Sequence, residues 1–308
     1  MACSLASNAT GALQALDFAA KATIKIDTLA KVALVFDHYV HFKIMRMERY
    51  ETPTHHRTYT APYLHQFIMP SNLGMDWMLS KLKEKDGFDP IIIEDAKVFG
   101  IFFEAVKEEE CFMPFIFRCR GEYVCHVTPA FYLKNKKGAF FVTMDSVGLE
   151  PVVMTHRDII ENLPKSVTYV HVEEKRQLDG FSCRIEAIFL LHQLHRAFVK
   201  RPELDMEEIF FKLSASGIQD GALVGLLRGA FLKTSQYVIK DERRLELVSE
   251  KQETLEAYQR TYTRSVIRFI GQAGSGVHGA DPVNLSVYLQ CKALKYFLKL
   301  DLETKKEK

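Results

Sequence analysis

The spacing of hydrophobic residues changes twice along the chain. Residues 10–50 and the segment MDWMLSKLKEK carry apolar positions at helical spacing, and the second pattern stops where Gly87 and Pro90 interrupt it. The helical segment THRDIIENLP stands before the last of four short β-rich runs, which are MPFIFRC, EYVCHVTPAFYLK, AFFVTM and VTYVHVEE. After residue 200 the pattern is helical again. This order predicts an α+β fold, with a small mixed sheet and flanking helices, followed by a helical C-terminal region.

The same changes divide the chain into three parts. We expect a mainly helical N-terminal region at 1–95, an α+β core at 96–200 and a helical region at 201–308. The Gly-rich stretch at 271–282 lacks the strand, G-x-G-x-x-G and helix order of a dinucleotide site. A flexible connector is therefore the better interpretation of that stretch.

Composition narrows the class of protein. The 308 residues are 47% hydrophobic, enough for a sizeable core, and we expect a soluble globular protein. No apolar run approaches the roughly 18 residues that span a bilayer, and the N-terminus lacks the pattern of a secretory signal peptide. A net charge of +2 argues against nucleic acid as a partner. The six cysteines form no C-x-x-C pair, so neither a disulfide framework nor a metal site is indicated.

One cysteine stands where a nucleophile could. Cys183 follows a polar turn and begins the apolar helical run CRIEAIFLLHQL, so it fits both a buried structural thiol and a thiol raised on a helix N-terminus. A free thiol has a pKa of about 8.5, so a nucleophilic role needs a helix N-terminus, an imidazole, or both. His192 and His195 lie nine and twelve residues further along the same helix. That spacing places them roughly 13 Å or more away, too far to serve.

A more distant histidine could activate the thiol. His126 lies within one predicted strand, and the next strand ends at Asp145, where a carboxylate could orient the imidazole. His171, on the strand before the Cys183 helix, is more simply a packed or edge histidine. Six residues before Cys183, the side-chain amide of Gln177 could join the backbone N–H of the cysteine as an oxyanion donor.

The order of these four residues resembles a known pattern. H-x18-D followed by Q-x5-C is similar to the motif of the Ulp/adenain-like cysteine peptidases. The chain after the cysteine narrows the resemblance to the YopJ family of bacterial effector acyltransferases. AFLKTSQ at 230–236 resembles the family's F-Y-K-H-T-Q, EKQETLEAY at 250–258 resembles K-K-N-E-T-L, and LSVYLQCKALKY at 285–296 resembles S-V-H-K-K-R-I-A-E-Y. The likeness covers residues 95–308. It implies that 96–200 is a catalytic core of the Ulp-like cysteine peptidase type and that 201–308 is a regulatory region that packs on this core.

The resemblance implies acetyl transfer in two steps. His126 would take the proton of Cys183, whose sulfur would attack acetyl-CoA, while Asp145 would hold the imidazole. A Ser, Thr or Lys of a host protein would then accept the acetyl group, and Lys233 matches the lysine on which the family acetylates itself. The family also implies secretion by a bacterium into the host cell cytoplasm.

The resemblance further implies inositol hexakisphosphate as an activator that orders the C-terminal region into a surface for coenzyme A. Between residues 228 and 299 there are 12 Lys and Arg against 7 Asp and Glu, and a polyphosphate needs several convergent cations. We expect Lys251, Arg260 and Lys292 among the cofactor-binding residues. A solvated helical face with scattered cations would have the same sequence pattern.

Two other functions fit the same residues. A Ulp-like deubiquitinase or isopeptidase would use the same four residues with water as the acceptor, and only the resemblance after Cys183 argues against it. A catalytically inactive binding protein of the same fold is the third possibility. Its best support is Arg184, which stands where the family usually has glycine. The sequence leaves open the target protein, the acyl donor and the oligomeric state.

Overall fold

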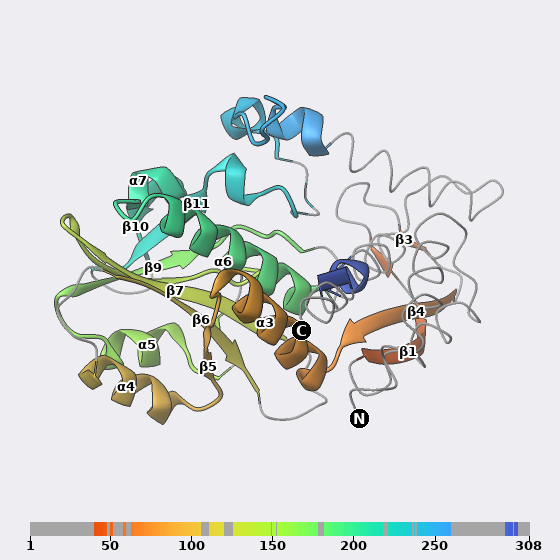
Figure 1. Cartoon of the computed structure of the whole chain (residues 1–308), viewed down its shortest axis with the longest axis horizontal. Coiled ribbons are helices and arrows are strands. Elements are labelled where there is room, and N and C mark those ends of the chain that lie inside the picture. The colour runs from red at the N-terminus through yellow and green to blue at the C-terminus, as the bar shows by residue number, and fades with distance from the viewer. Residues whose placement is uncertain are drawn as a thin grey trace. The chain divides into compact units, whose positions relative to one another are not determined.

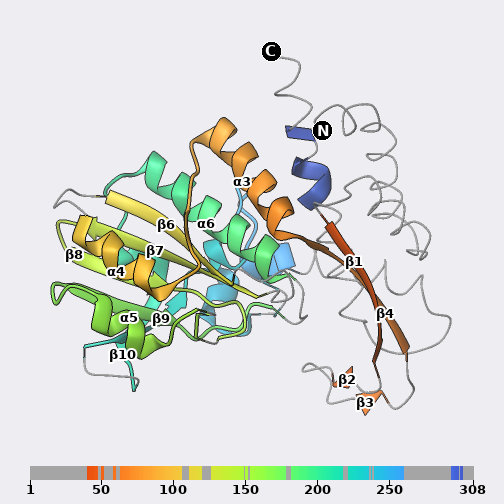
Figure 2. The same cartoon turned by 90° about the horizontal axis from the view of Figure 1, so that it is seen from below.

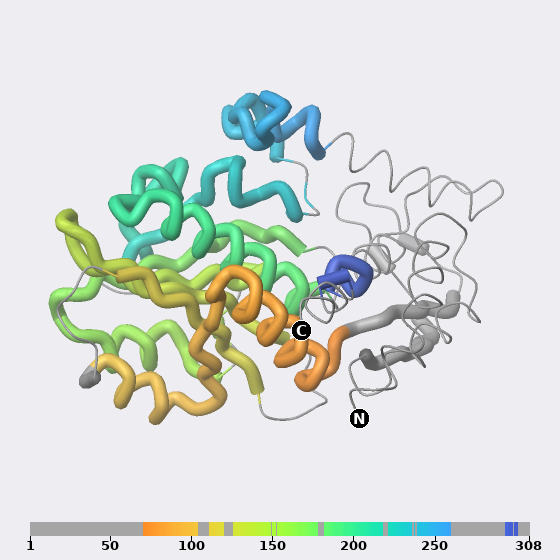
Figure 3. The backbone as a smooth tube through the Cα atoms, viewed as in Figure 1, coloured from red at the N-terminus to blue at the C-terminus, as the bar shows by residue number. Residues whose placement is uncertain are grey.

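The computed structural model describes a large part of the chain (Figure 1; Figure 3). The described residues are 40–47, 50–51, 58–59, 63–105, 111–119, 126–148, 150–151, 153–177, 182–217, 221–235, 237, 239–259, 293–297 and 299–300.

The chain forms two compact units that each combine separate stretches of sequence. One unit contains residues 1–81, 178–185 and 260–308, and the other contains residues 82–177 and 186–259. Helices α3 (Asn72–Asp86) and α6 (Cys183–Lys200) contribute residues to both units. The boundaries of the two units therefore differ from those expected at residues 95 and 200. The division into three functional regions stays a prediction.

A mixed sheet forms the centre of the second unit. Among the described residues its seven strands have the order β10-β11-β9-β8-β7-β6-β5. Antiparallel pairing joins β6, β7 and β8, whereas β5 with β6, β8 with β9 and β9 with β11 pair in parallel. The strands are β5 (Ile91–Ile93), β6 (Cys111–Arg118), β7 (Val127–Asn135), β8 (Gly138–Thr143), β9 (Val167–Val172), β10 (Phe210–Ala215) and β11 (Leu223–Leu227). The expected α+β class, with a mixed sheet and flanking helices, is confirmed.

One face of this sheet carries helices α4 (Ala96–Ala105) and α5 (His156–Asn162) over an aromatic core (Figure 1). Phe141 of β8 is fully buried, with its ring centroid 5.0 Å from that of Phe99 and 5.7 Å from that of Phe103, both on α4. Phe115 of β6 packs edge-on against the same ring at 5.5 Å, and Ile159 of α5 is fully buried in this cluster. The predicted THRDIIENLP helix is therefore present as α5.

Helix α6 covers the opposite face of the sheet. Phe112 of β6 stacks on Phe198 of α6, with ring centroids 5.3 Å apart, and on Phe131 of β7 at 5.4 Å. The neighbours of Phe131 along β7, Ala130 and Tyr132, belong instead to the aromatic core under α4 and α5. Because side chains alternate along a strand, this strand is apolar on both sides and lies between two layers of helix.

The other unit contains two pairs of antiparallel strands and the first part of α3. Strand β1 (Val40–Met47) pairs with β4 (Tyr63–Pro70), and β2 (Tyr50–Glu51) pairs with β3 (Thr58–Tyr59) (Figure 2). The helical expectation for residues 10–50 is wrong at β1. In VHFKIMRM the apolar and polar residues mostly alternate, which suits a strand, and β4 supplies its hydrogen-bonding partner.

Helix α3 confirms the helix predicted from MDWMLSKLKEK. It begins after Ser71, whose hydroxyl accepts a hydrogen bond from the backbone N–H of Gly74 at 2.9 Å, as at a typical N-cap. Trp77 of this helix lies against Phe297 near the C-terminal end, with ring centroids 6.2 Å apart.

The expectation of a purely helical region at 201–308 is wrong for β10 and β11. Strand β11 lies beside β9 in parallel, and β10 continues the sheet at its edge. The run LVGLL is too short for its period to separate strand from helix, so pairing with β9 decides. Gly225 of β11 permits a close approach, because a Cβ there would lie 2.4 Å from the ring of Phe210. Short helices accompany these strands: α7 (Met206–Ile209), η2 (Gly229–Phe231) and η3 (Glu242–Leu245).

We expect Phe141→Ala to lower the free energy of unfolding of the protein by about 3–5 kcal/mol, because it empties the centre of the aromatic core. Leu245→Ala is the matched control: Leu245 is 62% exposed, and its truncation should change stability by less than about 0.5 kcal/mol. Guanidinium denaturation followed by circular dichroism measures both. Equal midpoints for the two variants would contradict this placement of the core.

Candidate active site

The first two residues of the predicted site meet at one end of the β7–β8 pair. His126 directly precedes β7, and Asp145 follows β8 by two residues. Nε2 of His126 lies 2.5 Å from Oδ2 of Asp145, so the expected contact is present. The side chain of His126 is 27% exposed, whereas that of Asp145 is fully buried. The imidazole therefore has one side toward a buried carboxylate and part of its surface accessible.

The carboxylate of Asp145 is held from several directions. The hydroxyl of Thr128 donates to Oδ2 at 2.7 Å, and the backbone N–H of Val147 donates to Oδ1 at 2.9 Å. Burial by itself would raise the pKa of Asp145, but the hydrogen bond and charge of His126, together with these two donors, outweigh it and keep the pKa below its usual value. Asp145 is therefore ionised and fixed in orientation at neutral pH.

Gln177 lies beside the loop that carries Asp145. The carbonyl oxygen of Ser146 accepts hydrogen bonds from the backbone N–H groups of Arg176 at 2.8 Å and Gln177 at 3.0 Å. The Ser146 hydroxyl donates to Oε1 of the Gln177 side chain at 2.6 Å. This bond directs the oxygen of the amide toward Ser146, so its NH₂ group faces away from it. An NH₂ group held in this way can act as an oxyanion donor.

A glycine brings these two segments together. Gly148 has a φ of +75°, and a Cβ at this position would lie only 2.8 Å from the carbonyl oxygen of Glu173. Both the left-handed backbone and the close approach require glycine. The loop after β8 can therefore run against the segment after β9.

Two buried residues that the sequence did not single out join this loop to helix α6. Arg176, 1% exposed, donates through Nε to Oε1 of Glu186 and through Nη2 to the carbonyl oxygen of Met144, each at 2.6 Å. Glu186 lies in the first turn of α6 and is 6% exposed. The available sequence signal was weak: an acidic residue within an otherwise apolar stretch, and an arginine just before Gln177.

Cys183 is the first residue of α6 and is 1% exposed. It belongs to the unit of residues 1–81, 178–185 and 260–308, whereas His126, Asp145 and Gln177 belong to the other unit. The prediction that its thiol meets His126 therefore stays a prediction. The next residue, Arg184, is buried and donates through Nη1 to the carbonyl oxygen of Pro70.

A buried hydrogen-bonded cluster lies among β8, β9 and α5. The hydroxyl of Tyr169 lies 2.7 Å from Oγ1 of Thr143 and 2.6 Å from Nδ1 of His156. The rings of His156 and His171 have centroids 4.2 Å apart. Burial lowers the pKa of both histidines, and that of His171 falls to about 4. His171 is therefore a packed, neutral histidine, as expected.

The residues predicted for self-acetylation and cofactor binding are partly described. Lys233 is half-buried, with its Nζ 6.0 Å from the ring centroid of Tyr258. Burial lowers the pKa of Lys233, although the charge of Glu250 opposes the shift. Lys251 is exposed in the turn that precedes the pairing of Thr254 with Leu247. The predicted Arg260 and Lys292 lie outside the described residues.

Two findings concern other classes of site. Within the part of the chain that the structure describes, no group of three His, Cys, Asp or Glu side chains could hold a metal ion. No helix among the same residues is both long and apolar enough to cross a membrane.

Comparison with known proteins gives similarity in structure alone. No family model matches the chain, and no curated protein does. A structure of AvrA delL154 with IP6 and CoA is 11% identical with a TM-score of 0.44, and the match covers 73% of this chain and 86% of that chain. HopZ1a in complex with IP6 and CoA is 12% identical with a TM-score of 0.46, covering 74% and 84%. HopZ1a in complex with IP6 is 10% identical with a TM-score of 0.41 over the same shares.

We expect acid to destabilise the protein through its buried histidines. The folded protein holds His171 neutral, with a pKa of about 4 against an ordinary value of 6.5, whereas the unfolded chain binds a proton below 6.5. The stability that His171 contributes is therefore present above pH 6.5 and is lost as the pH falls toward 4. At pH 5 this loss amounts to about 2 kcal/mol.

His171→Phe removes the titrating group and retains an aromatic ring. Guanidinium unfolding at pH 7 and pH 5 should show a smaller acid-induced loss for this variant than for the wild type. If both proteins lose the same stability over this range, His171 does not govern the acid sensitivity.

Proposed function

We propose that the protein is an effector acetyltransferase of the YopJ family, with Cys183, His126 and Asp145 as its catalytic residues. The observation that carries the proposal is the 2.5 Å contact between His126 and Asp145, two residues that the motif H-x18-D pairs. AvrA and HopZ1a, which the chain resembles in fold, are effectors of that family. The acetyl group would come from acetyl-CoA and pass through Cys183 to a Ser, Thr or Lys of a host protein.

The geometry of the histidine assigns its proton. Nε2 of His126 faces the ionised Asp145, so Nε2 carries the hydrogen and Nδ1 is the basic nitrogen. In the first step Nδ1 takes the proton of Cys183, the sulfur bonds to the acetyl carbon, and coenzyme A leaves with that proton. In the second step the acceptor gives its proton to Nδ1 and takes the acetyl group, and the Cys183 thiol is restored.

The oxyanion that forms in each step needs donors. The NH₂ group of Gln177 is oriented by the bond between its oxygen and Ser146, and the backbone N–H of Cys183 lies at the N-terminus of α6. Together these two groups would stabilise the negative oxygen.

Arg184 does not favour the catalytically inactive alternative. Its guanidinium is engaged by the carbonyl oxygen of Pro70. Neighbouring residues on a helix point about 100° apart, so Arg184 and Cys183 do not share a face. The departure from glycine at this position is therefore compatible with a reactive thiol at the preceding residue.

Acetyl transfer is favoured over isopeptide hydrolysis by the region after Cys183. Strands β10 and β11 belong to the same sheet as β7 and β8, so residues 210–215 and 223–227 of this region are part of the core. The region holds Lys233, whose pKa is lowered by burial, so a larger fraction of its amine is neutral and able to accept an acetyl group. The same proposal includes secretion of the protein by a bacterium and its action in a host cell.

Inositol hexakisphosphate is the proposed activator, and IP6 and CoA are the molecules named for AvrA and HopZ1a. Among the exposed cations described after Cys183, we propose Lys240, Arg244 and Lys251 as candidates to bind the polyanion. Arg243 does not fit that role, because Asp241 and Glu174 already bind its guanidinium.

The first test of the proposal is labelled acetyl-CoA with and without inositol hexakisphosphate. Cys183→Ala should abolish self-labelling at Lys233 and transfer to host proteins, and Asp145→Asn should reduce the rate by about 10⁴-fold because it gives the imidazole the wrong tautomer. Cys111→Ala is the control and should retain activity, because Cys111 pairs with Lys134 at the far end of β7, whereas Val127 at the near end adjoins His126. Transfer by Cys183→Ala would overturn the mechanism.

A ubiquitin suicide probe, incubated in parallel, tests the isopeptidase alternative. Labelling of Cys183 by that probe, without acetyl transfer, would replace the proposal with the Ulp-like function.

The second test concerns the activator. A ligand that binds only the folded protein at a hundredfold excess over its Kd stabilises it by about 2.7 kcal/mol, so inositol hexakisphosphate should raise the Tm. Lys251→Glu should reduce the rise, whereas Lys136→Glu, an exposed lysine in the turn after β7, should not. An unchanged Tm for the wild type, with no heat in a calorimetric titration, would show that inositol hexakisphosphate is not its activator.

A further inference from the structure

We infer that Arg176 is a positioning residue for the proposed reaction. Its guanidinium fixes the loop that carries Asp145 to the first turn of the helix that begins with Cys183. The inference rests on the proposed function and adds a residue to it that has no direct role in the chemistry.

The guanidinium of Arg176 makes hydrogen bonds through all three of its nitrogens inside the protein. Nε donates to Oε1 of Glu186 at 2.6 Å, and Nη2 donates to the carbonyl oxygen of Met144 at 2.6 Å and reaches Oε2 of Glu186 at 3.5 Å. Nη1 donates to the carbonyl oxygen of Glu174 at 3.2 Å. Both charged side chains are more than nine-tenths buried. One planar group therefore joins three segments in fixed directions, which a lysine could not do.

Each segment that Arg176 joins lies next to a proposed catalytic group. Met144 directly precedes Asp145, and Arg176 itself directly precedes Gln177. Glu186 follows Cys183 by three residues on α6, a rise of about 4.5 Å along the axis. The spacing between the loop that carries Asp145, the segment that carries Gln177 and the turn of α6 that carries Glu186 therefore depends in part on this side chain.

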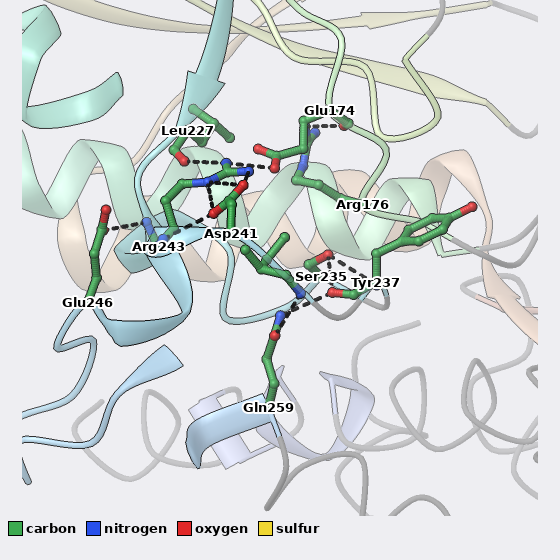
Figure 4. A network of polar contacts seen from close by, with 11 residues as sticks. Glu174, Arg176, Leu227, Ser235, Tyr237, Asp241, Arg243, Glu246 and Gln259 are labelled. Carbon is green, nitrogen blue, oxygen red and sulfur yellow. Dashed lines mark hydrogen bonds and ion pairs between the residues drawn. The ribbon is translucent and has the colours of Figure 1, made fainter. Parts of the chain in front are cut away.

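The segment that carries Arg176 is itself anchored on its other side (Figure 4). Glu174 forms an ion pair with Nη1 of Arg243 at 2.7 Å. The same nitrogen donates a hydrogen bond to the carbonyl oxygen of Leu227 at the end of β11. Asp241 binds Nη2 of Arg243 at 2.6 Å. Residues 173–177 have no helix or strand, so these contacts, with those of Ser146, are what fixes them.

The energetic cost of burying the charges of Arg176 and Glu186 indicates that this pair has a role beyond stability. Removing two charges from water costs several kcal/mol per ion, and well-packed apolar residues of similar volume are often as stabilising. An apolar pair at Arg176 and Glu186 would fill the space but could not hold the carbonyl oxygen of Met144. Directional contact with the backbone beside Asp145 is what the charged pair adds.

The experiment compares single and double replacements in the full-length protein. Arg176→Met or Glu186→Leu alone leaves one buried charge unpaired and should lower the Tm by several degrees. The double variant Arg176→Met with Glu186→Leu removes both charges and should recover most of the Tm. Its kcat for acetyl transfer should stay about 100-fold below wild type, with the KM for acetyl-CoA little changed, because a displacement of about 1 Å has a cost of that size.

A second readout does not need acetyl-CoA. The rate at which iodoacetamide alkylates Cys183 at pH 6.5, followed by mass spectrometry of the peptide, reports whether the thiol is activated by its neighbours. The double variant should lose most of that rate. Asp86→Asn is the control, because Asp86 pairs with His192 at 2.6 Å further along α6: it should lower the Tm and leave the alkylation rate unchanged.

The outcomes separate this inference from the proposed function. If the double variant regains wild-type kcat and alkylation together with its Tm, Arg176 is only structural and the inference is overturned, while acetyl transfer by the wild type stands. If Cys183 of the wild type reacts no faster than the other cysteines and no acetyl group is transferred, the proposed function is overturned, and the positioning role with it.

Discussion

The pairing of β7 with β8 is the constraint on which the rest of the candidate site depends. The register that sets Ala130 opposite Thr143, continued by two residues, sets Thr128 opposite Asp145. Thr128 accordingly donates to the Asp145 carboxylate, and His126, two residues further, reaches the same oxygen. A slip of one residue would turn Asp145 to the other face of the sheet. The aromatic core around Phe141 makes such a slip costly, because it would remove that ring from its contacts with Phe99 and Phe103.

The remaining polar groups of the candidate site lie on a segment without helix or strand, and buried charges hold that segment in place. The segment 173–177 contains Glu174, Arg176 and Gln177 and is joined to the loop after β8, to α6 and to the end of β11. Burying these charges has an energetic cost, but it replaces the regular hydrogen bonds that a strand or helix would have supplied. Polar groups on such a segment can be as well fixed as groups on the sheet itself.

The region after α6 is tied to the core more closely than a separate helical domain would be. Strands β10 and β11 extend the sheet, and Arg243 connects the end of β11 to Glu174, next to Arg176. A ligand that ordered residues around Arg243 would act on the segment that also positions Gln177.

Some of this was determined by the sequence alone. The strands around His126 and Asp145 are adjacent and joined by a short turn, so local patterns sufficed to predict their contact, and the apolar run after Cys183 was enough to place a helix start there. Tertiary structure alone decided that LVGLL is a strand, because pairing with β9 outweighs an ambiguous period. It alone also decided the partners of Arg176, which lie 10 and 32 residues away. The identity of a charged residue does not tell whether it lies in water or in the core. Only the fold determines whether its charge is solvated or must be paired.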